Sequence, residues 1–193
     1  MSTIRYRVPV GVPQGASTIC WLACAVMIMQ YKRGTTALRL SELGIDDGLD
    51  FRMGSVPNTN NPERSNVEYA RRLRQLGFTL VRLQPRPRGC APGDAAHVQW
   101  LLRERGPLIL NHFIGSFWYG SNRVSVPKGL PKHPPGMPLG AHAVVITGWD
   151  SSLGRVYFNN PWGDADVPTS ESSIIGAIHR WEAPDRFPLA YLP

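Results

Sequence analysis

The chain has 193 residues, a length typical of one domain, with a formal net charge of +7 and a pI of about 9.8. No long run of Lys or Arg accompanies this charge, so it favours solubility over a dedicated nucleic-acid site. Three cysteines, an odd number, argue against a disulfide framework. The longest apolar run, residues 19–29, is about half of what crosses a membrane. We expect no membrane span and no nucleic-acid partner.

Helix signals dominate the first half of the sequence. Apolar positions and capping residues predict helices over residues 17–31, 66–76 and 94–105, which begin at Ser17 or Thr18, at Asn66 and at Asp94. Residues 47–65 are rich in Gly, Asn and Pro and indicate a loop.

Strand signals follow from residue 106 onward. Short apolar runs predict strands over residues 108–113, 141–149 and 155–159, with a hairpin connection over 150–154. Residues 120–140 read as a long Pro/Gly loop, and one more strand is expected between Ser173 and Pro184. Helices followed by an antiparallel sheet predict the α+β class.

Cys20 stands at the start of the most apolar helix, where the helix dipole and unpaired backbone N–H groups favour the nucleophilic thiolate. Cys24, one turn further on, reads as a core residue. Gln14, six residues before Cys20, can offer its side-chain amide to a developing oxyanion. A metal site built from Cys20, Cys24 and His142 lacks a fourth ligand, so we expect neither metal nor cofactor.

A thiol nucleophile needs a base, and His142 opens the strongest predicted strand; His112, in the preceding strand, is the other credible base. Asn160 ends the next strand, and the following Pro161 keeps it extended. Its side-chain oxygen can accept a hydrogen bond from the His142 ring and so fix the tautomer. Trp162 can cover that bond from water.

Four motifs in this order resemble the active-site signatures of the papain family of cysteine peptidases. They are Gln14, Cys20-Trp21, His142-Ala143-Val144 followed by Gly148, and Asn160-Pro161-Trp162-Gly163. The Gln-to-Cys spacing of six and the short interval from His142 to Asn160 also match. The segment from Gly106 to Leu110 resembles the family's strand before the histidine region.

The resemblance implies one papain-like domain over residues 1–193, with a helical lobe over about 1–105 and an antiparallel sheet lobe over about 106–193. It also implies that Cys20, His142 and Asn160 form the catalytic triad and that Gln14 contributes to the oxyanion hole. The partner implied is a protein or peptide substrate. We expect further substrate contacts from four residues, Trp21, Trp118, Ala141 and Trp162.

Some features depart from plant and lysosomal papains. Thr18-Ile19 replaces the usual Gly-Ser before the nucleophile, and we expect none of the lobe disulfides, the signal peptide or the propeptide of those enzymes. The chain looks more similar to compact bacterial papain-fold peptidases, including secreted effectors and toxins. That similarity adds a cognate inhibitor or immunity protein as a partner. Because residues 1–7 contain no apolar signal core, we expect a cytoplasmic location, or secretion without a classical signal peptide.

Several alternatives stay open at this stage. In some bacterial relatives the third triad member is Asp, so Asp164 or Asp166 is an alternative to Asn160. A peptidoglycan amidase or endopeptidase, or a deamidase or acyltransferase acting on a host protein, could use the same residues. A binding protein on a dead protease fold belongs to another class, and the intact set of four residues argues against it.

Overall fold

The structure, a computed structural model, describes residues 3–10, 20–38, 62–84, 94–113, 141–161, 163–184 and 186–193, with the side chains of 62–68 excluded. Its helices are α1 (Cys20–Arg33), α3 (Pro62–Gln75), α4 (Asp94–Arg105) and α5 (Glu171–Trp181). Its strands are β1 (Thr3–Arg5), β2 (Thr79–Val81), β3 (Leu108–Phe113), β4 (Ala141–Asp150), β5 (Arg155–Asn160), β6 (Asp164–Ser170) and β7 (Leu189–Tyr191). The α+β class is therefore confirmed. Among the helices of these described ranges, none is long and apolar enough to cross a membrane.

All strands join one antiparallel sheet in the order β2-β7-β3-β4-β5-β6, and β1 also pairs with β4. β4 is the centre of this sheet. Its first part, residues 141–146, pairs with β3, and its last part, residues 148–150, pairs with β1. β5 runs along its other edge. The start of β4 and the end of β5 consequently meet at the same end of the sheet.

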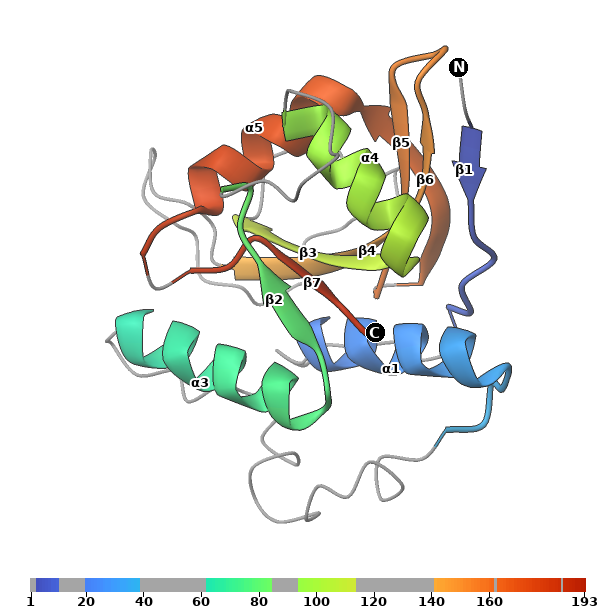
Figure 1. Cartoon of the computed structure of the whole chain (residues 1–193). Coiled ribbons are helices and arrows are strands. Elements are labelled where there is room, and N and C mark those ends of the chain that lie inside the picture. Colours follow the sequence, from blue (N-terminus) through green and yellow to red (C-terminus); the bar gives the residue numbers. More distant parts are fainter. Residues whose placement is uncertain are drawn as a thin grey trace.

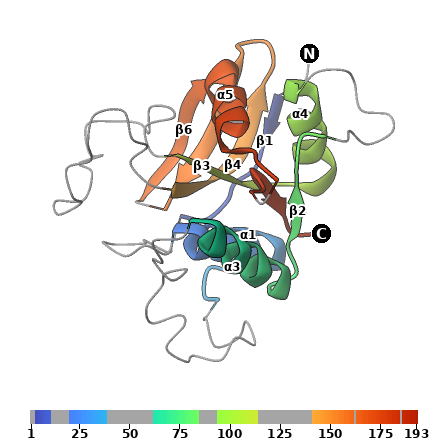
Figure 2. The same ribbon diagram turned by 90° about the vertical axis from the view of Figure 1, so that its left-hand side faces the viewer.

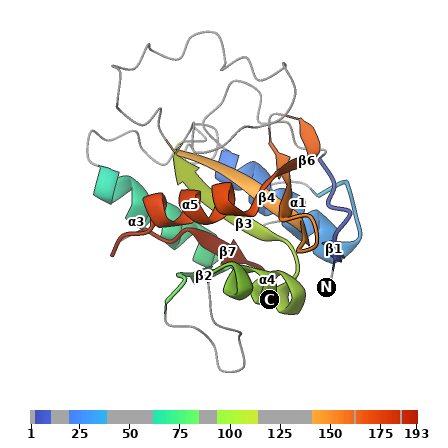
Figure 3. The same ribbon diagram turned by 90° about the horizontal axis from the view of Figure 1, so that it is seen from above.

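Helices cover both faces of the sheet (Figures 1 and 2). α1 and α3 lie on one face, and α4 and α5 lie on the other, with α5 crossing above β3 (Figure 3). Alternate residues of β4 enter the two cores: Val144 and Ile146 pack in the cluster with α4 and α5, whereas Ala143 and Val145 pack in the cluster with α1. Burial on both faces explains why this strand reads as a nearly continuous apolar run.

α4 and β3 have the predicted bounds, and β4 and β5 each extend one residue beyond theirs. α3 begins at Pro62, within the segment expected to be a loop. β1 and β2 precede residue 105, so helices and strands are less segregated along the chain than the two-lobe expectation implies.

The expected strand from Ser173 is wrong, because this segment belongs to α5. Ser170 caps the helix, and its hydroxyl accepts a hydrogen bond from the Ser173 backbone N–H at 3.2 Å. The buried residues of α5 recur at helical spacing on the face that meets the sheet: Ile174, Ala177, Ile178 and Trp181. This periodicity of 3.6 residues, not the alternation of a strand, decides the structure.

Gly148 allows β1 to lie close to β4. A Cβ atom at this position would come within 2.6 Å of Arg5 Cδ and 2.7 Å of the Ile4 carbonyl oxygen. Only glycine accommodates this approach. The Tyr6 backbone N–H then donates to the Thr147 carbonyl at 2.8 Å, which attaches the N-terminal segment to the strand that begins with His142.

Candidate active site

His142 and Asn160, which the sequence pattern paired, lie together at one end of the sheet. His142 is the second residue of β4 and Asn160 is the last of β5. The Nε2 atom of His142 lies 3.0 Å from Oδ1 of Asn160. The His142 side chain is 3% exposed and Asn160 is fully buried, so water does not compete for this hydrogen bond.

Asp164 determines which atom Asn160 turns toward the histidine. It begins β6, directly opposite Asn160 in register, and its Oδ2 accepts a hydrogen bond from Asn160 Nδ2 at 3.3 Å. A carboxylate only accepts, so the amide oxygen of Asn160 faces His142. Nε2 of His142 therefore carries the proton, and Nδ1 keeps its lone pair as the basic atom of the ring.

Asp166, the other aspartate considered, lies elsewhere. Its carboxylate pairs with Arg5 at 3.2 Å on the surface, and its backbone adopts a φ of 52°. The backbone N–H of Asp166 donates to the Asn159 side chain. Of the two aspartates, Asp164 reaches the histidine, and it does so through Asn160.

Cys20 is the first residue of α1 and is partly exposed. Its sulfur faces the backbone N–H groups of Ala143, Trp21 and Cys20 itself. Ala143 follows His142 directly, so the thiol lies against the backbone of β4 next to the candidate base. The packing of α1 beneath β4 produces this approach (Figure 1).

The protonation state of Cys20 differs from the sequence expectation. Burial raises the pKa of the thiol from 9.0 to about 11, while hydrogen bonding by the N–H groups of Ala143, Trp21 and Cys20 lowers it by less. Desolvation thus outweighs the helix terminus, and the raised pKa favours the thiol over the thiolate that the helix position suggested.

His142 is neutral under the same conditions. Burial lowers the pKa of its imidazole from 6.5 to about 4, and the hydrogen bond to Asn160 opposes this shift in part. The resting site thus holds a neutral thiol beside a neutral imidazole whose Nδ1 is unprotonated. This arrangement suits a general base that takes the thiol proton during the reaction.

The other predicted site residues have different positions. Gln14, Trp118 and Trp162 lie outside the described residues. Trp21 is 4% exposed and packs edge-to-face on Tyr69 with ring centroids 5.9 Å apart, which leaves little of it for a substrate. Ala141 is exposed beside His142, as a substrate contact requires. Cys24 is fully buried in the core, as expected.

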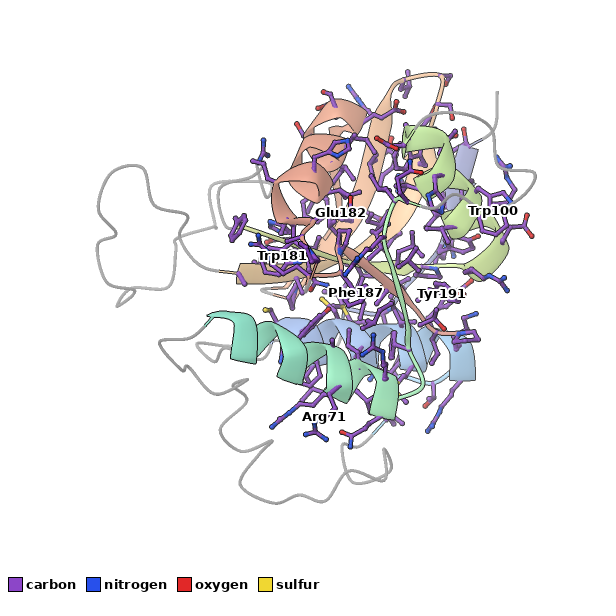
Figure 4. All side chains as sticks on the ribbon, turned by 60° about the vertical axis from the view of Figure 1, so that its left-hand side comes forward. Arg71, Trp100, Trp181, Glu182, Phe187 and Tyr191 are labelled. Carbon is purple, nitrogen blue, oxygen red and sulfur yellow. The ribbon has the colours of Figure 1, made fainter. Side chains whose placement is uncertain are left out.

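Sequence reasoning did not identify Tyr69 as a neighbour of the site. Burial raises the pKa of its phenol well above 10.0, and Asn111, Cys24 and Cys20 also influence that pKa. Asn111 in turn donates to the Phe187 carbonyl at 3.2 Å. Phe187 and Trp181 lie in the layer between α5 and α3 (Figure 4). The helical spacing of α3 marked its apolar positions but gave no signal for this tyrosine.

The described residues contain no group of three His, Cys, Asp or Glu side chains that could hold a metal ion. No protein-family model matches this chain, and no curated protein matches it either. The arrangement of Cys20, His142, Asn160 and Asp164 therefore carries the functional argument.

Proposed function

We propose that this protein is a papain-like cysteine hydrolase that cleaves peptide or amide bonds through Cys20, His142 and Asn160. The observation that carries the proposal is the buried hydrogen bond from His142 to Asn160 at 3.0 Å, next to the backbone N–H that faces the Cys20 sulfur. The placement of a cysteine helix against the sheet that bears the histidine also supports a papain-like fold (Figure 2).

The neutral resting pair defines the first chemical step. His142 Nδ1 accepts the thiol proton as the Cys20 sulfur attacks the carbonyl carbon of the substrate. Asn160 stabilises the imidazolium that forms, because its oxygen accepts from Nε2–H. Hydrogen bonds between nucleophile and base are often long before substrate binds and shorten in the complex.

The later steps return the enzyme to its starting state. The oxyanion that forms on the carbonyl collapses, the C–N bond breaks, and the leaving amine takes the proton from His142. Water then attacks the thioester and gives its proton to His142 Nδ1, and the acid product leaves as the thiol is re-formed. The Gln14 amide and the Cys20 backbone N–H are the proposed donors to the oxyanion.

Mass spectrometry of defined substrates tests the proposal. Purified protein is incubated with an unfolded protein, with peptidoglycan and with a glutamine-rich protein, and the products are compared with those of Cys20→Ala. We expect peptide fragments that together gain one water for each bond cleaved and that are absent in the variant. Cys24→Ala is the matched control, because this cysteine lies one turn along α1 and is fully buried.

The same experiment separates the alternatives. Cleaved peptidoglycan with intact protein would assign a cell-wall amidase or endopeptidase, and conversion of side-chain amides to acids would assign a deamidase. Equal products from wild type and Cys20→Ala would contradict the proposal. A secreted effector role, with a cognate inhibitor as partner, is a further part of the proposal that rests on the resemblance alone.

A further inference from the structure

A second histidine lies directly against the candidate base. His112 in β3 is opposite His142 in β4 in the antiparallel register. Residues directly opposite each other project from the same face of a sheet, so their side chains meet. The two ring centroids are 5.7 Å apart and the ring planes are inclined by 89°, which places the edge of one ring on the face of the other.

The backbone of β3 holds His112 firmly. Its Nδ1 atom lies 2.8 Å from the carbonyl oxygen of Phe113, and because a carbonyl only accepts, Nδ1 carries the proton. The residue is fully buried. His112 therefore presents a fixed, buried ring to His142.

Charged groups approach this pair from several elements. Burial is the main cause that lowers the pKa of His112 to about 3. The charges of His142 and of Arg180 on α5 lower it further, and the hydrogen bond to the Phe113 carbonyl opposes the shift. Cys20 approaches from α1 and Asp164 from β6, the latter through Asn160. His112 consequently stays neutral wherever His142 is neutral, and two buried imidazolium groups do not coexist.

We propose that His112 is a positioning residue that packs against the His142 ring, fixes its orientation and shields it from water, so that Nδ1 of His142 is held as a base toward Cys20. This inference rests on the proposed function for the role of His142 as a base. His112 then controls the pH below which His142 becomes protonated and turnover falls. The sequence alone presents His112 only as an alternative base.

NMR titration of the imidazoles in the full chain tests the inference without requiring turnover. His112→Asn removes the ring but keeps a side-chain N–H for the Phe113 carbonyl, and His112→Ser is a second, smaller variant. We expect either change to admit water and to raise the pKa of His142 from about 4 toward 6.5. The pH at which kcat declines on the acid side should rise with this pKa. The maximal kcat should fall while KM changes little.

Two variants separate positioning from a merely structural role. His112→Phe keeps an aromatic ring against His142, so the pKa of His142 and the pH of this decline should stay near those of the wild type. His97→Ala is the matched control, because His97 is also buried, with Nδ1 2.9 Å from the Leu83 carbonyl, but lies on α4. Thermal unfolding of each variant measures how much the substitution lowers the stability of the fold.

An unchanged pKa of His142 in folded His112→Asn or His112→Ser overturns the inference, as does an equal shift in His97→Ala. Failure of the proposed function gives a different result. In that case Cys20→Ala leaves the products unchanged, whatever the titration of His142 shows.

Discussion

Asn160 and Asp164 face each other across β5 and β6, and the Asn160 amide nitrogen donates to the Asp164 carboxylate at 3.3 Å. This contact fixes the amide so that its oxygen meets His142, and through it the tautomer of the ring. A residue four positions beyond Asn160 thus determines which nitrogen of His142 is basic.

This relationship predicts a graded series of activity losses. His142→Ala should reduce kcat most, by about 10²–10⁴-fold, because the proton carrier is lost. Asn160→Ala should cost less, because it removes only orientation and support of the imidazolium. Asp164→Ala should cost least, about tenfold, as expected for a hydrogen bond to a charged group worth roughly 1.5 kcal/mol.

Steady-state kinetics of the three variants, with unfolding curves to compare their stability, measure this order. Asp166→Ala is the matched control for Asp164→Ala, because its carboxylate pairs with Arg5 on the surface. An equal loss in the two aspartate variants would show that Asp164 does not act through Asn160.

Alkylation should distinguish the two cysteines of α1. Cys20 is partly exposed and Cys24 is fully buried, so iodoacetamide should modify Cys20 first. Because the pKa of Cys20 is about 11, the rate should keep rising with pH through the neutral range, by about tenfold per pH unit.

Peptide mapping after brief labelling checks this expectation. A Cys90→Ser background removes the cysteine outside the described residues. Earlier labelling of Cys24 would show that the nucleophile is misassigned. A rate that is already constant at neutral pH would show that Cys20 is a thiolate.

Acid should destabilise the fold through two of its buried histidines, His142 and His112. The pKa values of His142 and His112 are about 4 and about 3 in the folded protein, below the ordinary 6.5. Below about pH 6.5 the unfolded chain binds protons at these rings and the folded chain does not. The free energy of unfolding should fall by about 1.4 kcal/mol per pH unit for each ring, down to its folded pKa.

Denaturant unfolding at several pH values between about 7.5 and about 4.5 measures this slope. His112→Phe removes one of the two titrating rings and should halve the slope attributed to the pair. His179→Ala is the control, because His179 is largely exposed and pairs with Asp94 at the surface. A stability independent of pH over this interval would contradict the burial argument.

Gln14 provides a prediction outside the described residues. If its amide donates to the oxyanion, Gln14→Ala should lower kcat by about 10²–10³-fold and leave KM nearly unchanged, because the bond matters in the transition state. Alkylation of Cys20 forms no oxyanion, so its rate should not change. Normal turnover by this variant would remove Gln14 from the site.

The pairing of His142 with Asn160 was predictable because both mark strand ends. A largely apolar strand of ten residues begins at Ala141, and Pro161 stops the next strand directly after Asn160. Antiparallel neighbours then bring the start of one strand to the end of the other. The class of the fold followed from the same runs.

Other features depended on tertiary structure. The contact of His112 with His142 follows from the register between β3 and β4, which residue types alone do not determine. The neutral state of Cys20 follows from how deeply α1 packs beneath the sheet. α5, in contrast, could have been predicted from the sequence. A capping residue, Ser170, precedes apolar positions at helical spacing, namely Ile174, Ala177 and Ile178.

The pairing of β1 with β4 bears on how the protein is made. Thr3 lies opposite Asp150, and Val8 accepts a hydrogen bond from the Asn159 side chain, 151 positions further along the chain. Contacts between such distant segments form slowly and late in folding. During synthesis the segment that precedes Cys20 must therefore wait for strands that emerge long after it. Cys20 stays separated from His142 until β4 has left the ribosome, and His142 lacks Asn160 until β5 has followed, so a chain that ends before β5 has no assembled site.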